Sequence, residues 1–206
     1  MLSFFYFDMG NVLLNFSHER GARQMAEVAG STPEAVWKLV FAGDDLEDRC
    51  ERGDLDARGL YDIFCQQTKT QADFDLLERA GCDIFELNLP IVPIVGHLKA
   101  AGHRLGILSN TSASHWNFVT DGRYGLLPGY FEQFVLSYEV RSMKPERAIY
   151  DVAIEKAGVP ANEIFFCDDR PDNVAGALAA GIDAVQFHTA KQLGEELRQR
   201  GVEMNY

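Results

Sequence analysis

The second half of the chain repeats one pattern, in which a short apolar run is followed by polar residues and then by a helix-length segment that ends at a glycine. Glycines of this kind are Gly102, Gly158 and Gly181, and glycine readily terminates a helix. Strands that alternate with helices at short spacing form a parallel sheet with helices on both faces. We therefore predict an α/β fold with a doubly wound parallel sheet, its strands at 104–108, 134–137, 164–167 and 184–187 and its helices at 91–101, 145–157, 171–180 and from about 191.

A further strand is predicted near the N-terminus, over the aromatic run Phe4–Phe7. The segment that follows contains no strong strand pattern as far as residue 88, and Pro33 suits the first turn of a helix there. The pattern predicts a core of residues 1–15 and 89–206, with a small helical cap inserted after the first strand. The cap, residues 16–88, is expected to contain helices at 17–29, 33–40, 57–67 and 72–79.

The composition excludes several classes of protein. The chain has 206 residues, of which 47% are apolar and 24% charged, an ordinary mixture for a domain with a modest insertion. A formal net charge of -12 without basic stripes argues against nucleic acid as a partner. No apolar stretch in the sequence approaches the roughly 18 residues of a membrane span. We expect a cytoplasmic protein without membrane contacts, present as a monomer or a homodimer.

Three of the predicted strands end in polar residues that can do chemistry, namely Asp8, Ser109-Asn110 and Asp168-Asp169. Ligands of such sheets bind beyond the carboxyl ends of the strands. A carboxylate can attack phosphorus as a covalent nucleophile when a cation offsets its charge. Acids beside Asp8 would hold Mg²⁺, which takes one or two carboxylates together with phosphate oxygens and water. The simpler interpretations are a turn-forming aspartate at position 8 and helix capping by the acid pair.

Two other features would suit a phosphoryl site. Lys144 lies just before a predicted helix, where a surface lysine is the commonest interpretation, but beside a phosphoryl group it would stabilise the transferring charge. In that role, its replacement by alanine should lower turnover far more than stability, since a lysine beside a helix start adds little to folding and exposed ion pairs contribute roughly 0–1 kcal/mol. Unchanged turnover would support the surface interpretation. Ser109 and Asn110 are expected to begin a helix, where they would bind an anion or serve as a simple N-cap.

Taken together, the strand ends resemble the motifs of the haloacid dehalogenase superfamily. The matching segments occur in the family's order and span most of the chain: Phe7-Asp8-Met9-Gly10-Asn11-Val12, Leu108-Ser109-Asn110-Thr111, Met143-Lys144-Pro145 and Phe166-Cys167-Asp168-Asp169-Arg170-Pro171-Asp172-Asn173. The resemblance is to the branch with a small helical cap after the first motif. That branch includes bacterial sugar-phosphate phosphatases and the phosphatase domain of soluble epoxide hydrolases. It implies a phosphatase that acts on a small phosphorylated metabolite.

The resemblance implies a magnesium site built on the first and fourth motifs. Asp8 would be both the nucleophile and a metal ligand, and the backbone carbonyl of Gly10 would be a second ligand. Asp169 would be the other metal-binding acid. Asp168 would bind Mg²⁺ either directly or through water.

The resemblance also implies roles for the second and third motifs. Ser109 and Asn110 would bind the phosphoryl oxygens, and Lys144 would hold the nucleophile and the phosphate together. Asn173 would orient Lys144 or the metal-binding acids. Asp172 fits a solvent-facing position in the first turn of the helix.

One position departs from the family pattern. The family usually has an aspartate two residues after the nucleophile, as a general acid and base, and this chain has Gly10 there. Without that acid, the leaving oxygen must depart with little proton assistance or take its proton from another group. Activated esters would then be favoured, and among sugars an anomeric phosphate over a primary one. A sugar 1-phosphate is the substrate class that this position favours.

Two further points stay open on the sequence alone. The segment Glu51-Arg52-Gly53-Asp54 resembles a loop of the same branch and could face the substrate, but a solvated turn is the preferred interpretation. The function also has two alternatives. A 2-haloacid dehalogenase works without metal and usually has serine-rich sequence in place of the acid pair, which this chain retains. A catalytically degenerate binding protein is favoured only by Gly10.

Overall fold

The computed structural model describes residues 2–42 and 46–203. Its centre is a five-stranded sheet in the order β5-β4-β1-β6-β7, and every neighbouring pair is parallel. This confirms the predicted α/β class and the predicted strands to within about one residue. The strands are β1 (Phe4–Phe7), β4 (Arg104–Ser109), β5 (Gln133–Leu136), β6 (Ile164–Asp168) and β7 (Asp183–Gln186).

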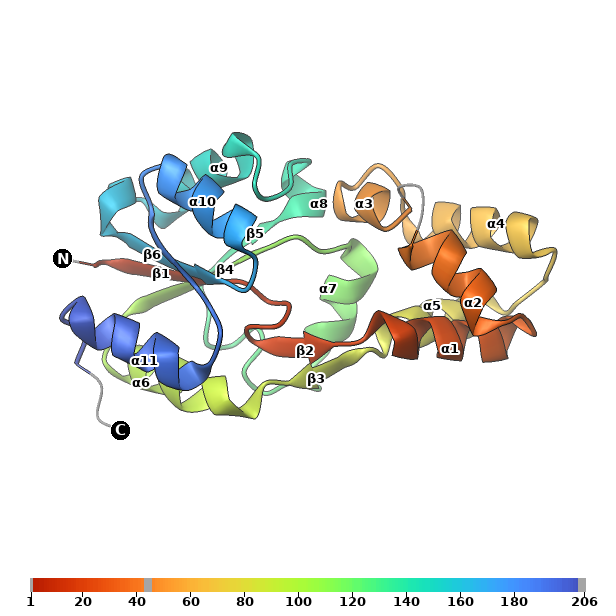
Figure 1. Ribbon diagram of the computed structural model, residues 1–206, viewed down its shortest axis with the longest axis horizontal. Coiled ribbons are helices and arrows are strands. Elements are labelled where there is room, and N and C mark those ends of the chain that lie inside the picture. Colours follow the sequence, from red (N-terminus) through yellow and green to blue (C-terminus); the bar gives the residue numbers. More distant parts are fainter. Residues whose placement is uncertain (1, 43–45, 204–206) are drawn as a thin grey trace.

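Helices cover both faces of the sheet (Figure 1). One face packs against α6 (Val92–Ala100) and α11 (Ala190–Gln199), and the other against α9 (Arg147–Ala157) and α10 (Pro171–Ala179). Successive residues of a strand point to opposite faces, so each central strand is apolar throughout. In β1, for example, Phe5 and Phe7 enter the first core while Phe4 and Tyr6 enter the second.

The segment after β1 forms a separate helical body, at the right of Figure 1. We call residues 18–82 the cap; its helices pack around an apolar cluster of their own that includes Met25, Val36, Phe64 and Leu77. The helices predicted at 17–29, 57–67 and 72–79 are present with shifted ends. The cap elements are α1 (His18–Ala29), α2 (Pro33–Val36), a π-helical turn (Trp37–Phe41), α3 (Leu46–Glu51), α4 (Ala57–Thr68) and α5 (Phe74–Cys82).

Two parts of this region differ from the prediction. Helix α3 was not predicted, because its six residues bury only Leu46 and carry no helical apolar stripe. The short antiparallel hairpin of β2 (Leu14–Phe16) and β3 (Phe85–Leu87) was also missed, since three-residue strands are too short to show alternation. The hairpin connects cap and core at the two predicted domain boundaries; the division itself stays a prediction.

Polar residues after β4 do not begin a helix, contrary to the prediction. Helix α7 (Ala113–Val119) starts later, with Ser112 as its N-cap, because the Ser112 side chain accepts a hydrogen bond from the His115 N–H. The remaining short elements are 3-10 turns at Leu89–Ile91 and Ala161–Glu163 and the helix α8 (Ser137–Val140). Within residues 2–42 and 46–203, no helix has both the length and the apolar character needed to cross a membrane.

The carboxyl ends of β1, β4 and β6 meet at the edge of the sheet that faces the cap (Figure 1). Phe7 pairs with Ile107 on one side and Cys167 on the other, and the Asp8 N–H continues the ladder by donating to the Cys167 carbonyl at 3.0 Å. Asp8 therefore lies between Leu108 and Asp168. Parallel register thus brings the chemical residues of the separate motifs together.

Candidate active site

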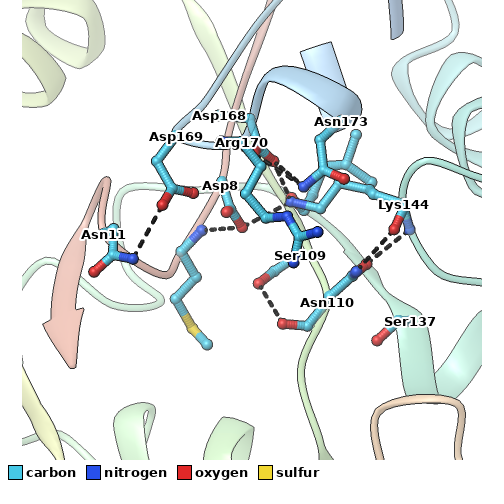
Figure 2. Close-up of polar contacts among 12 residues, drawn as sticks. Asp8, Asn11, Ser109, Asn110, Ser137, Lys144, Asp168, Asp169, Arg170 and Asn173 are labelled. Atoms are coloured by element: carbon cyan, nitrogen blue, oxygen red, sulfur yellow. Dashed lines mark hydrogen bonds and ion pairs between the residues drawn. The ribbon is translucent and has the colours of Figure 1, made fainter. Parts of the chain in front are cut away.

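Asp8 is held at the end of β1 with 7% of its surface exposed. Its Oδ1 accepts a hydrogen bond from the Met9 N–H at 2.7 Å and lies 2.8 Å from the Lys144 Nζ (Figure 2). Burial raises the pKa of the Asp8 carboxyl to about 7, although the charge of Lys144 acts in the opposite direction. Among the residues described, none donates a hydrogen bond to Oδ2. That oxygen is therefore available for attack.

Lys144 is a buried residue, so the surface interpretation was wrong. It is 4% exposed, and its Nζ contacts Asp8 at 2.8 Å, Asp168 at 2.5 Å and the Leu108 carbonyl oxygen at 3.0 Å. Burial by itself would lower the pKa of this ammonium group, but the carboxylates of Asp168 and Asp8 more than offset it and hold the pKa above its ordinary value. Lys144 therefore carries a fixed positive charge beside Asp8.

We expect the Lys144→Met variant to lose both activity and stability. Its removal leaves buried carboxylates without their counter-charge, which costs about 3–5 kcal/mol of unfolding free energy. In the phosphoryl role predicted for Lys144, the loss of its charge should lower kcat by roughly 10²–10³-fold. Urea unfolding and phosphate release measure the two effects, with Lys99→Met, an exposed lysine of α6, as the control. An unfolding free energy equal to that of the wild type would contradict the buried-pair argument.

Three carboxylates form a cluster at this edge of the sheet. Asp8, Asp168 and Asp169 each offer an oxygen within 4.8 Å of the others. Asp168 is fully buried, and besides Lys144 it accepts hydrogen bonds from the Arg170 N–H at 2.9 Å and from the Asn173 side chain at 3.0 and 3.1 Å. Asp169 is partly exposed and accepts from Asn11 at 3.0 Å. Asp169 also lines the cavity described below, so it is more accessible than Asp168.

This donor set fits a hard divalent cation. Clustered carboxylates repel one another unless a cation lies between them, and oxygen ligands are those that Mg²⁺ prefers. Asp8 and Asp169 would hold the ion, together with the Gly10 carbonyl, to which no N–H donates within the described part of the chain. A direct role for Asp168 stays a prediction; its existing contacts favour an orienting role.

Asn173 and Asn110 both act on the site through neighbours. Asn173 is 2% exposed and contacts Asp168 rather than Lys144, in keeping with the orienting role predicted for it. The Asn110 side chain donates to the Lys144 carbonyl at 3.0 Å and accepts from the Lys144 N–H at 2.8 Å. Ser109 is fully buried, and its Oγ donates to the Asn110 carbonyl at 3.2 Å. Phosphoryl binding by Ser109 and Asn110 stays a prediction, and the Asn110 side chain is already committed to the Lys144 backbone.

A cavity of about 210 Å³ joins these core residues to the cap. Asp8, Lys144 and Asp169 line it from the core, together with Asn11 and Thr111, which sequence reasoning did not select. Asn11 adopts a left-handed backbone conformation (φ 54). Asparagine tolerates this conformation better than most residues, so its place directly after the Asp8 strand was a local signal of a tight turn there. From the cap the cavity is lined by His18, Glu47, Asp48 and Glu51.

The segment Glu51-Arg52-Gly53-Asp54 is a cap–core contact, not a solvated turn. Arg52 pairs with Glu146 at 2.6 Å, and Asp54 pairs with Arg141 at 3.1 Å, both partners lying on the core. Gly53 lies so close to the core that a Cβ there would come within 2.3 Å of the Tyr138 carbonyl oxygen. We call residues 51–54 the docking loop, because it fixes this side of the cap against α8.

We expect the Gly53→Ala variant to displace the docking loop. Both its positive φ of +74 and the Tyr138 carbonyl oppose a side chain at this position, at a cost of about 1–3 kcal/mol. Since small misplacements of site groups are costly, kcat/KM should fall by roughly 10–100-fold. Gly30→Ala is the matched control, because Gly30 has a similar φ of +63 and open space around it. Equal activity losses in the two variants would contradict the docking role.

Comparison with known proteins agrees with this geometry. The family model for haloacid dehalogenase-like hydrolases matches residues 5–181. A phosphoglycolate phosphatase of Colwellia psychrerythraea is 30% identical over 50% of this chain and 45% of its own length. An (S)-2-haloacid dehalogenase of a Pseudomonas species is 30% identical over 63% of this chain and 62% of its own. The chain thus spans roughly half to three-fifths of these curated relatives.

Solved structures share the whole architecture at lower sequence identity. A family enzyme of Bacteroides thetaiotaomicron, crystallised with magnesium and inorganic phosphate, has a TM-score of 0.77 at 23% identity and covers 92% of this chain and 96% of its own. An L-2-haloacid dehalogenase of Xanthobacter autotrophicus has a TM-score of 0.64 at 18% identity over 98% of this chain and 85% of its own. Sheet order, site geometry and the family match agree, and the chain belongs to the haloacid dehalogenase-like hydrolases.

Proposed function

We propose that this hydrolase is a magnesium-dependent phosphomonoesterase that acts on a small phosphorylated metabolite through an aspartyl-phosphate at Asp8. The observation that carries the proposal is the charge arrangement around Asp8. A buried lysine holds one carboxylate oxygen at 2.8 Å, and two further acids lie beside the nucleophile. An anionic phosphate can enter such a site only when a cation neutralises the acids.

In this proposal each group has a distinct task. Mg²⁺ would neutralise charge between the carboxylates and the phosphate. Oδ2 of Asp8 attacks phosphorus while Lys144 holds Oδ1 and balances the charge that develops on the phosphoryl group. Water then releases phosphate and restores Asp8. The magnesium and phosphate held by the Bacteroides enzyme, and the phosphatase activity in the name of the Colwellia relative, support this assignment.

A second candidate, 2-haloacid dehalogenase, is favoured by the Pseudomonas relative, which matches at the same identity as the phosphatase. In that reaction an aspartate displaces halide from carbon, and no anionic phosphate has to be neutralised. Asp168 and Asp169 would then have no cation to hold beside Asp8. The degenerate-binder alternative rests on Gly10 alone, whereas the buried Asp8–Lys144 pair is retained.

Two features bear on the substrate class. The acid missing at Gly10 favours a sugar 1-phosphate, whose leaving oxygen is acidic, as long as no other residue supplies the proton. A second cavity of about 340 Å³ shares Glu47, Glu51 and His115 with the site, and most of its wall is apolar, including Phe41, Leu60, Phe64 and Phe74. This lining favours a leaving group with an apolar part.

A magnesium-dependent screen tests the proposal. Purified protein is assayed for phosphate release from sugar 1-phosphates, sugar 6-phosphates, aryl phosphates and phosphoglycolate, and for halide release from 2-haloacids. We expect phosphate release that requires Mg²⁺, with the best esters among the sugar 1-phosphates or the aryl phosphates. Halide release without metal would assign the dehalogenase function instead. If neither phosphate nor halide is released from any of these compounds, the catalytically degenerate binding protein is favoured.

A further inference from the structure

The position of the missing acid lies against an aromatic ring in this chain. A Cβ built on Gly10 would lie 2.9 Å from a ring carbon of Phe16, which belongs to β2. A longer side chain at residue 10 would have to displace that ring. The loop after Asp8 therefore has room for the usual general acid only if the Phe16 ring moves. A proton donor for the leaving group must come from another element.

Glu51 lines the site from the cap, at the C-terminal end of α3. It lines both the cavity that contains Asp8 and Lys144 and the larger apolar cavity of the cap. Asp8 would hold the phosphoryl group in the first cavity, so the leaving group must extend from it toward the cap. Glu51 is thus placed where the two parts of a substrate would join.

The Glu51 carboxyl is held near the site but is not committed to another contact. Among residues 2–42 and 46–203 it forms no hydrogen bond or ion pair, in contrast to Glu47, which lies 2.9 Å from His18. Its neighbours in the docking loop, Arg52 and Asp54, are the ones tied to the core. The loop therefore fixes the position of Glu51 and leaves its carboxyl available.

We propose that Glu51 is the general acid and base of the reaction, supplied by the cap in place of the side chain that Gly10 lacks. This rests on the proposed phosphatase function. Asp8 Oδ2 forms a bond to phosphorus as the bond from phosphorus to the leaving oxygen breaks, and that oxygen takes the proton of the Glu51 carboxyl. In the second step, a water molecule gives a proton to the Glu51 carboxylate and its oxygen forms a bond to phosphorus. The bond from phosphorus to Asp8 Oδ2 breaks, so that phosphate leaves and both side chains return to their starting states.

The ionisation of Glu51 suits this task. Burial, then the nearby charges of Glu47, Asp48 and Asp8, raise the pKa of its carboxyl to about 8, and Lys144 opposes the shift. The group is therefore protonated at neutral pH and can donate. The other titratable or charged groups that line these two cavities are His18, Cys50, Asp56, Tyr61, Glu78, Cys82, His115, Tyr138, Arg141, Asp169 and Arg170. Activity should fall as pH rises through the Glu51 pKa, because the donor is then lost.

The test is the leaving-group dependence of the Glu51→Gln variant. Single-turnover rates are measured for 2,4-dinitrophenyl, 4-nitrophenyl, phenyl and methyl phosphate with Mg²⁺. Glutamine keeps the shape and removes the proton. We expect the methyl ester to lose about 10²–10⁴-fold and the dinitrophenyl ester less than about tenfold, since a good leaving group needs no proton. The basic limb of the pH profile should also disappear from the variant.

Controls separate this role from a structural one. Glu27→Gln removes an exposed carboxylate of α1 that lines neither cavity and should behave as wild type on every ester. Glu51→Asp keeps an acid and should recover part of the rate with methyl phosphate. If Glu51→Gln does not fold, the leaving-group dependence is measured with Glu51→Asp instead. An equal loss on all four esters would overturn the proposal for Glu51 alone. No phosphate release from any ester by the wild type would overturn the proposed function as well.

Discussion

Replacement of Asp8 by Asn is expected to abolish turnover while the fold stays intact. Asparagine keeps the shape of the side chain, but its amide is a far poorer nucleophile, so the covalent step is lost. Removal of the nucleophile in a covalent hydrolase lowers kcat by on the order of 10⁶-fold. The measurements are phosphate release with the best ester from the screen and trapping of the site with beryllium fluoride, which should bind the wild type only.

Stability provides the control for this variant. Burial raises the pKa of the Asp8 carboxyl to about 7, so the ionised form of Asp8 lowers the stability of the folded protein. When Asp8 is replaced by a neutral residue, Lys144 still has an ion-pair partner in Asp168. The melting temperature of Asp8→Asn in metal-free buffer should therefore equal or exceed that of the wild type, with the larger difference above pH 7. Turnover close to wild type in a correctly folded variant would rule out Asp8 as the nucleophile.

Removal of divalent metal is expected to abolish activity, and Mg²⁺ or Mn²⁺ should restore it. Without the cation, the carboxylates of Asp8, Asp168 and Asp169 repel a dianionic phosphate in a partly buried site. Chelation followed by titration of Mg²⁺ measures the effect on phosphate release. Asp169→Ala should raise the Mg²⁺ concentration needed for half-maximal rate by at least about tenfold, because it removes a ligand from the accessible side of the cluster.

Asp172→Ala is the matched control for the metal experiment. Asp172 lies three residues further along the same segment, but its carboxylate pairs with Arg170 at 2.9 Å on the exposed side of α10. Its replacement should leave the Mg²⁺ requirement unchanged. Full activity of the wild type after exhaustive chelation would exclude the magnesium model.

The sequence predicted the parallel sheet and the grouping of its polar strand ends correctly, and both depend on local patterns. The run Phe4–Phe7 and its counterpart at 164–167 are apolar throughout because each strand is covered on both faces, and glycines end the helices between strands. Parallel register then requires Asp8 and Asp168 to meet. The hairpin of β2 and β3 and the helix α3 escaped prediction because each is too short to show a period.

What the tertiary structure alone decided is the environment of individual side chains. Lys144 has the local sequence of a surface lysine, and its burial follows from partners on β1, β4 and β6. Glu51 has the local sequence of a solvated turn, and only the docking of the cap places it in the same cavity as Asp8. The order of motifs predicted the fold and placed the candidate nucleophile at a strand end, because strands and their ends are coded locally. Burial, counter-charge and pKa depend on contacts between distant segments, and these exist only once the chain has folded.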